Sequence, residues 1–427
     1  MNLTTASVDT LTQSATELRA QFEAYRQQGL NLDLTRGKPS SDQLTLADDL
    51  DGILKGNYTS AGGVDTRNYG GLEGLPELRQ LGAEMLGVNT DDILAQGNSS
   101  LTLMFLAVLT AKDFGLRGEA SAWKHETKIK FLCPVPGYDR HFSICEQLGI
   151  EMITVAMTAT GPDMDAVEAM VKADSNIKGM WCVPKYSNPT GVVYSDETVQ
   201  RIAALGNIAG DNFCVFWDNA YAVHDLNEVK PLASISAACA TAGTEDSVIQ
   251  FASTSKITHA GSGVAFIASS KANITGLKKV FGIMSIGPDK VNQLRHIKLI
   301  PNYASLLTHM QQHAGLLKPR FASVLSHLDE AFADTDLGQW ESVAGGYFVS
   351  FDAQPGLAKK IVSMAAELGV KLTPAGATFP YGNDPEDRNI RIAPTVPKLA
   401  QVDAAMKVFV LCVKLASIEK ALDARRF

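Results

Sequence analysis

Two side chains suited to covalent and ionic chemistry directly follow short apolar stretches of the chain. Lys256 ends the segment Ser253-Thr254-Ser255-Lys256, which follows the apolar residues 248–251, and Asp218 follows the apolar residues 214–217. A lysine amine can form a Schiff base with an aldehyde cofactor, and an aspartate at the end of a strand provides a fixed carboxylate. Each pattern is weak by itself, because Ser-x-Ser-Lys is usually a surface turn and such an aspartate usually caps a helix.

Three further loops hold residues that could serve the same site. Residues 184–191 contain prolines and present Asn188, and residues 134–138 form a similar loop that presents the aromatic ring of Tyr138. The segment Gly97-Asn98-Ser99-Ser100 precedes a predicted helix, where free backbone N–H groups suit a phosphate. The order and spacing of all five segments are more specific than any one of them, since Asn-Pro-Thr-Gly alone usually marks only a turn.

The elements that must position these residues alternate between helices and strands from about residue 75 to residue 310. Helices are predicted at 76–86 and 101–114, and short apolar runs predict strands at 130–133, 151–155, 179–183, 214–217, 248–251 and 263–267. Such alternation predicts a mostly parallel sheet with helices on both faces, and near-continuously apolar strands are typical of strands buried on both sides. Ligands of α/β sheets bind at the carboxyl ends of the strands, which is where Lys256 and Asp218 stand.

The two ends of the chain are organised differently. The predicted elements are a helix at 9–28, a strand at 30–34, a long helix at 309–332, a strand within 345–351, a helix at 356–368, a strand at 389–392 and a last helix at 398–422. We therefore predict an α/β protein of two domains. The large domain would span residues 45–310, and a smaller α+β domain would combine residues 1–44 with residues 311–427.

Composition and charge argue against several classes of protein. The 427 residues are 45% hydrophobic and 20% charged, with a net charge of −8, which predicts a soluble globular protein with no nucleic-acid partner. No apolar stretch is long enough for a membrane span and no signal peptide is evident, so the expected location is the cytoplasm. The six cysteines are expected as reduced core thiols. His309 and His313 are expected on a solvated helix face, and no metal site is predicted.

The combination of motifs resembles the class I aminotransferases, which are fold-type-I pyridoxal-phosphate enzymes. The resemblance runs from Leu32 to about Arg391, nearly the whole chain. It is carried by Leu32-Asp33-Leu34-Thr35-Arg36-Gly37-Lys38-Pro39, the segments 68–79 and 187–191, the pair Asp218 and Tyr221, Ser253-x-Ser255-Lys256, and Asn389-Ile390-Arg391. It is closest to a bacterial subgroup of aspartate aminotransferases, set apart by Arg36-Gly37-Lys38-Pro39 and Gly287-Pro288-Asp289-Lys290.

This resemblance implies pyridoxal 5'-phosphate as cofactor and a role for each matching residue. Lys256 would hold the cofactor as a Schiff base and then move a proton as general acid–base. Asp218 would keep the pyridine nitrogen protonated, so that the ring acts as an electron sink, while Tyr221 and Asn188 would donate to the phenolic oxygen. The other implied contacts are Tyr138 stacked on the ring, Asn98, Ser99, Ser100, Ser253 and Ser255 around the phosphate, Tyr69 at the phosphate of the neighbouring subunit, and Arg391, Asn188 and Gly37 on the substrate side. The shared phosphate contact implies a homodimer, and a higher oligomer stays open.

One position departs from the family's pattern. The family usually has an arginine about eight residues after the Schiff-base lysine, where it pairs with the phosphate, but Gly263 or Val264 stands there in this chain. His259, Ser262 or further backbone N–H groups are the candidates to hold the phosphate instead.

The substrate depends on which cation reads the side chain of the amino acid. Arg36 stands where the family usually has an apolar pocket residue, so it could pair with the distal carboxylate of aspartate or glutamate, although a structural ion pair is an alternative. Lys290 and Arg295, from this chain or a partner subunit, are rival candidates. We expect a ping-pong reaction in which aspartate, or a similar amino acid, gives its amino group to the cofactor and a 2-oxo acid such as 2-oxoglutarate receives it.

Other activities are compatible with the same motifs. An aminotransferase for alanine or aromatic amino acids, or a carbon–sulfur lyase, would use the same lysine and the same electron sink. An aminotransferase-like transcriptional regulator would need an additional DNA-binding domain, whereas the residues before Leu30 leave room for only one helix. A catalytically inactive scaffold is disfavoured because Lys256, Asp218 and Tyr221 are all present.

Overall fold

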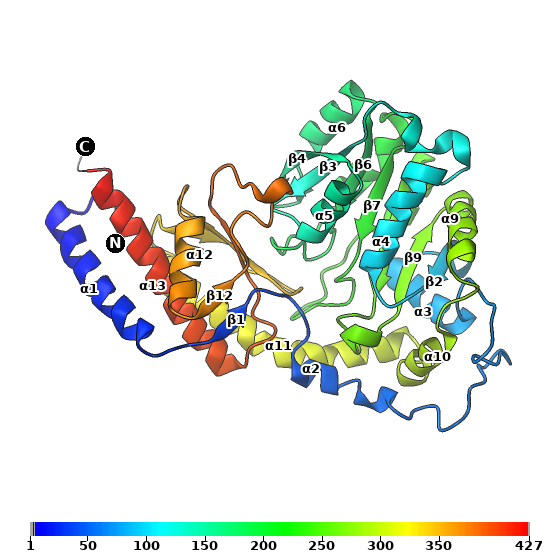
Figure 1. Cartoon of the computed structure of the whole chain (residues 1–427), viewed down its shortest axis with the longest axis horizontal. Coiled ribbons are helices and arrows are strands. Elements are labelled where there is room, and N and C mark those ends of the chain that lie inside the picture. The colour runs from blue at the N-terminus through cyan, green and yellow to red at the C-terminus, as the bar shows by residue number, and fades with distance from the viewer. Residues whose placement is uncertain (1–2, 4, 426–427) are drawn as a thin grey trace.

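The computed structural model describes residue 3 and residues 5–425, and the larger part of the molecule, at the right of Figure 1, contains a mixed sheet. The sheet has eight strands in the order β2-β9-β8-β7-β6-β3-β4-β5. These strands are β2 (Ile93–Ala95), β3 (Lys130–Val135), β4 (Glu151–Thr158), β5 (Gly161–Pro162), β6 (Ile177–Cys182), β7 (Cys214–Asp218), β8 (Val248–Ser253) and β9 (Ala265–Ser269). The pairs β3–β4, β3–β6, β6–β7 and β7–β8 are parallel, and the pairs β2–β9, β8–β9 and β4–β5 are antiparallel.

The central strands are buried on both faces, which explains their continuously apolar sequences. Every residue of β6, β7 and β8 is buried. Successive side chains point to opposite faces of a sheet, so Phe216 packs with α4 and α9 while Val215 and Trp217 pack with α6 and α7. The helices around this sheet are α3 (Pro76–Leu86), α4 (Ser100–Leu109), α5 (Asp139–Gln147), α6 (Met164–Ala173), α7 (Asp196–Ala204), α8 (Ile235–Ala242), α9 (Lys271–Met284) and α10 (Lys290–Leu299).

The smaller part, at the left of Figure 1, is built from both ends of the chain. β1 (Leu32–Leu34) pairs in parallel with β12 (Val370–Leu372), and an antiparallel sheet holds β10 (Gly338–Trp340), β11 (Val349–Ala353) and β13 (Asn389–Ile392). These strands share one apolar core with α1 (Val8–Arg26), α12 (Ala358–Glu367) and α13 (Leu399–Asp423).

One helix, α11 (Tyr303–Phe332), joins the two parts. Its first turns bury Leu306 and Met310 in the core that also contains α3 and β2, and its later turns bury Phe321 and Val324 in the core of the smaller part. The short helix α2 (Ser41–Thr45) lies against α11. Pro319 lies inside α11 and removes one helical hydrogen bond because proline has no N–H group.

The predicted α/β class is confirmed, and the predicted strands and helices are present with shifts at their ends, the helix predicted at 309–332 beginning at Tyr303. The strand predicted at 263–267 begins at Ala265, and the helix predicted at 101–114 is α-helical only to Leu109, beyond which residues 110–114 form a wider turn. All six cysteines are buried, and none of them forms a disulfide. In the described part of the chain, the helices lack the length and hydropathy that a membrane span requires. The domain limits at 45–310 and at 1–44 with 311–427 stay a prediction.

The expectation of a solvated face for His309 and His313 is wrong. The side chain of His313 is only 1% exposed, and both imidazoles hydrogen-bond to the backbone carbonyl of Ile257. The physical reason lies in the helical repeat of α11, which puts His313 on the same stripe as Leu306, Met310 and Leu317.

Candidate active site

A cavity of about 180 Å³ opens at the carboxyl ends of β7 and β8. It brings together ten of the residues predicted for the site: Gly37, Ser99, Ser100, Tyr138, Asn188, Asp218, Tyr221, Ser253, Ser255 and Lys256. Asn98, Arg36, Tyr69 and Arg391 are not among the residues that line it. The parallel strands account for this gathering, because their carboxyl ends, and the loops that follow them, meet at one edge of the sheet.

Lys256 stands in a tight turn that follows β8. The backbone N–H groups of Ile257 and Thr258 both donate to the carbonyl of Thr254, which fixes the direction in which the lysine side chain leaves the turn. Its Nζ lies 5.1 Å from the centre of the Tyr221 ring. Burial lowers the pKa of Lys256, against a smaller opposing effect of the nearby Asp218 carboxylate. A lowered pKa increases the fraction of neutral amine, which is the nucleophilic form.

Asp218 ends β7 and is almost completely buried, with 2% of its surface exposed. Its Oδ2 lies 3.0 Å from Nε2 of His141, and the His141 ring is stacked on Trp181 with centroids 4.2 Å apart. The second oxygen, Oδ1, is buried without a hydrogen-bond partner among the described residues. A buried carboxylate oxygen in this state is costly unless a donor or a positive charge meets it. The site therefore fits a cofactor that brings a protonated ring nitrogen to this position.

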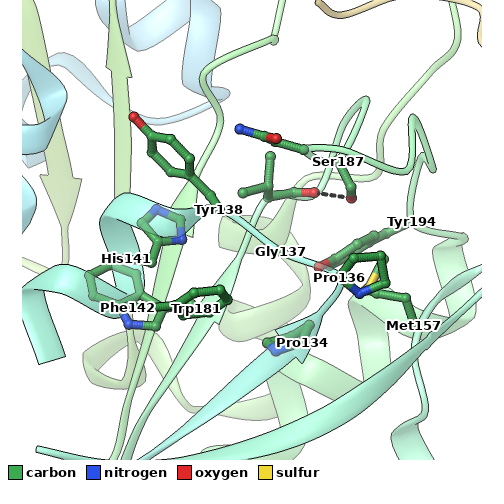
Figure 2. A pocket seen from close by; sticks show the side chains of 12 residues that line it. Pro134, Pro136, Gly137, Tyr138, His141, Phe142, Met157, Trp181, Ser187 and Tyr194 are labelled. Atoms are coloured by element: carbon green, nitrogen blue, oxygen red, sulfur yellow. Dashed lines mark hydrogen bonds between the residues drawn. The ribbon is translucent and has the colours of Figure 1, made fainter. Parts of the chain in front are cut away.

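Tyr138 stands between the main cavity and a second, smaller one of about 20 Å³, shown in Figure 2. This smaller space has room for about one water molecule. The Tyr138 ring meets His141 edge to face, with centroids 4.9 Å apart. Burial raises the pKa values of Tyr138 and Tyr221, so both phenols keep their protons at neutral pH and can donate hydrogen bonds.

The predicted phosphate end of the site is made of serines and a helix start. Ser99 and Ser100 begin α4, where the side chain of Ser99 makes no capping hydrogen bond, and Ser253 donates to Ser255 over 3.1 Å. Unpaired N–H groups and the helix dipole favour an anion at this position. Asn98 is exposed and its side chain donates to the carbonyl of Gly261, so only its backbone takes part, as acceptor from the Ser255 hydroxyl.

The positions that could replace the missing arginine supply no cation. Val264 is buried in an apolar core and its N–H donates to the hydroxyl of Thr254. A Cβ on Gly263 would lie 3.0 Å from that same hydroxyl oxygen. His259 instead faces Asp48, with 3.2 Å between Nε2 and Oδ1. Among the residues that line the cavity, Lys256 alone has a cationic side chain.

Arg391, on β13, lies behind the lining of the cavity and is held in place on several sides. Its Nη1 donates to Oδ1 of Asp139 over 3.0 Å and to Oδ1 of Asn188 over 3.2 Å. Its guanidinium carbon lies 4.9 Å from the centre of the Phe348 ring. Asn188 and Phe348 line the cavity, so Arg391 stands one layer behind the lining, with Asp139 as its present partner.

The three candidates for reading a distal carboxylate differ in their freedom. Arg36 is exposed and adjoins Gly37, which packs so closely on Phe348 that a Cβ would lie 2.3 Å from the ring. Lys290 is buried, and its ammonium donates to the carbonyls of residues 68 and 70. Arg295 is exposed on α10. Lys290 thus has two of its three N–H donors bound to carbonyls, whereas Arg36 stands beside the cavity.

Tyr69 is 83% exposed, so its side chain does not contribute to the cavity of its own chain. Sequence reasoning also missed several residues of this region. His141 follows Tyr138 by three positions, the spacing of one helical turn, which could have indicated it. Phe348 lines the cavity from a loop before β11, and the only signal for it was the run Gly345-Gly346-Tyr347-Phe348.

Comparisons with known proteins identify the family that this chain resembles. The sequence model of the family described as aspartate amino-transferase matches residues 6–425. An aspartate aminotransferase of Corynebacterium glutamicum is 44% identical over 94% of this chain and 93% of its own length. The crystal structure of an aspartate transaminase from the same organism has a TM-score of 0.95 with 42% identity, covering 99% of both chains. A more distant structure, of an α-aminoadipate aminotransferase from Thermus thermophilus complexed with N-(5'-phosphopyridoxyl)-L-leucine, has a TM-score of 0.73 at 21% identity and covers 91% of this chain and 93% of its own.

Proposed function

The chain belongs to the aspartate aminotransferase family, and on that premise we propose that it moves the amino group of aspartate to 2-oxoglutarate with pyridoxal 5'-phosphate as cofactor. It is an aminotransferase, and it has the α/β fold of pyridoxal-phosphate aminotransferases that the sequence motifs implied. The observation that carries the cofactor proposal is the pairing, in one cavity, of a lysine of lowered pKa with the unpartnered buried oxygen of Asp218.

The residues around the cavity fit the chemistry that such a cofactor needs. Pyridoxal phosphate, when bound, supplies an aldehyde carbon and a protonated ring that withdraws electrons from the amino acid. In our proposal Asp218 Oδ1 holds the proton on the ring nitrogen, and His141 orients the carboxylate through Oδ2. Tyr221 and Asn188 donate to the ring oxygen, and Tyr138 covers one ring face. Lys256 would accept the proton from the substrate Cα as a general base and deliver it to C4′ of the cofactor as a general acid.

The α-carboxylate of the substrate is proposed to bind Arg391. In the resting protein Nη1 of that arginine already has a carboxylate partner in Asp139, so an incoming substrate exchanges one carboxylate for another. A bidentate pair with the substrate would then fix the amino acid in two directions. Arg36, exposed next to Gly37, is proposed to pair with the distal carboxylate.

The phosphate is proposed to be held by neutral donors, namely the side chains of Ser99, Ser100, Ser253 and Ser255 and the start of α4, with Tyr69 from a second copy of the chain. Exposed apolar side chains support a homodimer, because Ile283, Met284 and Ile286 are all more than half exposed. They adjoin the Tyr69 segment, since a Cβ on Gly287 would lie 2.5 Å from the carbonyl oxygen of Gly70. We further propose that the enzyme acts in the cytoplasm, on small amino and 2-oxo acids.

The visible absorption of the purified protein loaded with pyridoxal phosphate tests the cofactor, the lysine and the donor together. We expect a band that disappears with aspartate, returns with 2-oxoglutarate and is absent from Lys256→Ala. Serial addition of alanine, an aromatic amino acid and cysteine to matched samples distinguishes the other activities of this scaffold. A band that ignores aspartate but responds to one of these would overturn the donor, and a band that survives in Lys256→Ala would overturn the role of the lysine.

Replacing Arg36 tests the proposed reading of the distal carboxylate. Arg36→Leu should lower kcat/KM for aspartate by roughly tenfold to a hundredfold, about 1.4 to 2.7 kcal/mol, and leave kcat/KM for alanine within about twofold. Arg295→Leu is the matched control, since that arginine is also exposed. Equal losses for aspartate and alanine in Arg36→Leu, or a selective loss for aspartate in Arg295→Leu, would contradict the assignment.

A further inference from the structure

A series of buried, hydrogen-bonded polar side chains connects α2 to the backbone of Lys256. Its members are Gln43, with 0% of its surface exposed, and His313 and Tyr347, each 1% exposed. Nε2 of Gln43 lies 2.9 Å from the Tyr347 hydroxyl and 3.1 Å from Nδ1 of His313. The Tyr347 hydroxyl in turn donates to the carbonyl of Lys256 over 3.3 Å.

One backbone group, the N–H of Ser40, determines the direction of every hydrogen bond in this series of side chains. The N–H of Ser40 donates to Oε1 of Gln43 over 3.1 Å, so the opposite end of the amide must be the NH₂ group. One of its hydrogens then goes to the Tyr347 oxygen and the other to Nδ1 of His313. The Tyr347 hydroxyl has its own hydrogen left for the Lys256 carbonyl. The reverse orientation of the amide would set two donors against each other at Ser40.

The same assignment of donors and acceptors determines which ring nitrogen of His313 carries the hydrogen. Its Nδ1 accepts from Gln43, so its hydrogen is on Nε2, which lies 2.9 Å from the carbonyl of Ile257. His309 contacts that carbonyl as well, over 2.7 Å. Burial is the main cause that lowers the pKa of His313 to about 4, so the imidazole is neutral, as this arrangement requires. The two successive carbonyls of Lys256 and Ile257 are therefore both held from the side of α11 and Tyr347, and Nε2 of His224 also lies 3.3 Å from the carbonyl of Lys256.

We propose that Gln43 is a positioning residue for Lys256, because it orients Tyr347 and His313 and through them fixes the backbone from which the lysine side chain extends. This inference rests on the proposed role of Lys256. Gln43 touches neither the cavity nor Lys256 itself, so it acts only through the two residues that it orients. The Tyr347 ring is also near the amine, with its centroid 6.0 Å from Nζ. A shift of Tyr347 would therefore affect both the backbone carbonyl and the amine of Lys256.

The proton affinity of the Lys256 nitrogen reports its position. The groups that face this nitrogen are the Asp218 carboxylate, the rings of Tyr221 and Tyr347, and the imidazole of His224, whose pKa is lowered by burial and by the charge of Lys256. Desolvation disfavours the charged form of a nitrogen base. A lysine that is held less firmly moves toward water, so its nitrogen binds a proton more tightly and the pH at which the bound cofactor changes its visible absorption moves upward.

The test is a pH titration of the visible absorption band of the loaded enzyme without substrate, in wild type, Gln43→Met, Tyr347→Phe and the double variant. Methionine keeps the length of the glutamine and removes its amide, and phenylalanine keeps the ring of the tyrosine. Gln293→Met is the matched control. That glutamine is equally buried and is bonded at both ends, to the N–H of Leu75 and the carbonyl of Ala95, and neither bond goes to Lys256 or Ile257.

We expect each single variant to move the midpoint upward by about 0.5 pH unit, roughly a threefold change in the protonation equilibrium. The double variant should move it no further than Gln43→Met alone, because residues that act in one series are not additive. Gln293→Met should leave the midpoint in place, and KM for aspartate should stay within about twofold in all variants. A Gln43→Met enzyme that titrates like wild type, or a double variant whose shift is the sum of the two single shifts, overturns the proposal.

Failure of the proposed function would look different. A wild-type band that is absent, or one that persists in Lys256→Ala, would refute the role of the lysine and this inference with it. If Gln43→Met fails to fold, Tyr347→Phe decides alone, because it keeps the ring in the core and removes only the hydroxyl. An unchanged midpoint in Tyr347→Phe then overturns the proposal.

Discussion

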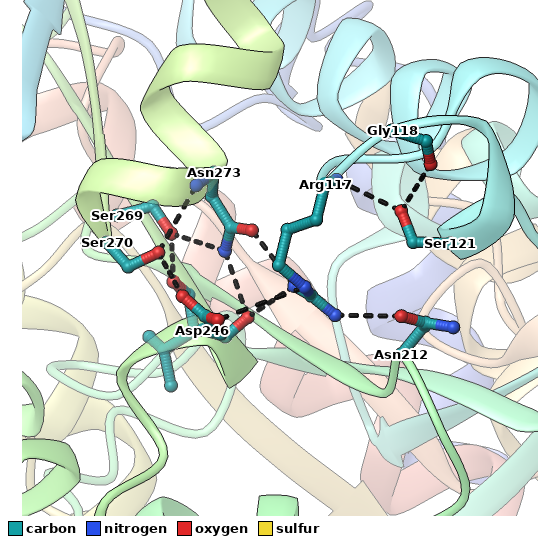
Figure 3. Close-up of polar contacts among 9 residues, drawn as sticks. Arg117, Gly118, Ser121, Asn212, Asp246, Ser269, Ser270 and Asn273 are labelled. Carbon is teal, nitrogen blue, oxygen red and sulfur yellow. Dashed lines mark hydrogen bonds and ion pairs between the residues drawn. The ribbon is translucent and has the colours of Figure 1, made fainter.

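Two polar clusters stand at opposite ends of β7 and β8, and they differ in how far their hydrogen bonds are satisfied. At the amino ends, Arg117 donates from Nη1 to Oδ1 of Asn273 and from Nη2 to Oδ1 of Asn212 (Figure 3). Asn273 donates to the carbonyl of Asp246 and to Ser269, and Ser270 donates to the Asp246 carboxylate. At the carboxyl ends, Asp218 Oδ1 and His224 Nδ1 are buried without hydrogen-bond partners among the described residues.

The difference separates a structural cluster from a functional one. In the Arg117 cluster every buried side-chain nitrogen and oxygen has a hydrogen-bond partner among the described residues, so the cluster stabilises the sheet without a ligand. The cluster around Lys256 keeps unused capacity in a buried space, which is unfavourable until a ligand supplies the missing partners. Charge alone would not have separated them, because both clusters combine a basic residue with an aspartate.

The largest expected effect comes from removing the charge of the unpartnered carboxylate. Asp218→Asn keeps the shape and can still accept a hydrogen bond from His141, but it no longer holds a proton on the cofactor ring. We expect kcat to fall on the order of 10³-fold, while the denaturation midpoint of the cofactor-free protein stays the same or rises. The measurements are steady-state transamination and denaturant unfolding. A loss of less than tenfold in kcat would refute the role given to this carboxylate.

At the amino ends of β7 and β8 we expect the opposite result, a loss of stability with little loss of activity. Asn273→Ala removes a fully buried amide that bonds Arg117, Asp246 and Ser269, so partners are left unsatisfied and unfolding should require about 2 to 3 kcal/mol less free energy. At a temperature where the variant is folded, kcat should stay within about twofold of wild type. Urea unfolding and steady-state rates on the same sample check both statements, and a large loss of kcat in the folded variant would remove the distinction between the clusters.

Acid should destabilise the cluster around Lys256 more than the Arg117 cluster, which contains no histidine. His313 has its pKa lowered from 6.5 to about 4, so the unfolded chain binds a proton between these pH values and the folded protein does not. Its stabilising effect is therefore complete above about pH 6.5 and is lost as the pH falls toward 4, by about 2 kcal/mol between pH 7.5 and pH 5. His224, whose pKa is also lowered by burial, contributes to the same slope.

Unfolding of wild type and His313→Gln by urea at both pH values checks this slope. The variant should lose less stability in acid than wild type does, and Asn273→Ala should be destabilised by a similar amount at both pH values. Equal slopes in wild type and His313→Gln would show that His313 is not buried as a neutral imidazole.

The smallest expected effect concerns the partner that Arg391 already has. Asp139→Asn weakens the pair with Nη1 and leaves the guanidinium more available to a substrate carboxylate. We expect KM for aspartate to fall by roughly threefold with little change in kcat. The full rate curve against aspartate concentration measures both constants. A rise in KM would mean that Asp139 orients Arg391 for the substrate instead of competing with it.

The sequence located those parts of the site that depend on where strands end. Lys256 and Asp218 follow buried apolar runs, and the geometry of parallel sheets brings such positions together. Gln43, His224 and Tyr347 could not be found in this way, because their partners are carbonyls and side chains far away in the sequence. The pair Gln43 and His313 is separated by 270 positions, and no local spacing encodes it. His313 did have a signal, because it lies on the apolar stripe of its helix with Leu306, Met310 and Leu317.

The proline inside α11 makes this helix easier to bend at one turn. Its carbonyl acceptor four residues earlier, at Gly315, receives no helical hydrogen bond from Pro319, so bending stiffness falls at that turn. A Cβ on Gly315 would meet no atom within 4 Å, so no packed side chain opposes bending of the helix at that position. A movement of the smaller part of the molecule would therefore bend α11 between the turn that carries His313 and the turn that carries Phe321, while its first turns stay packed in the core that contains α3 and β2.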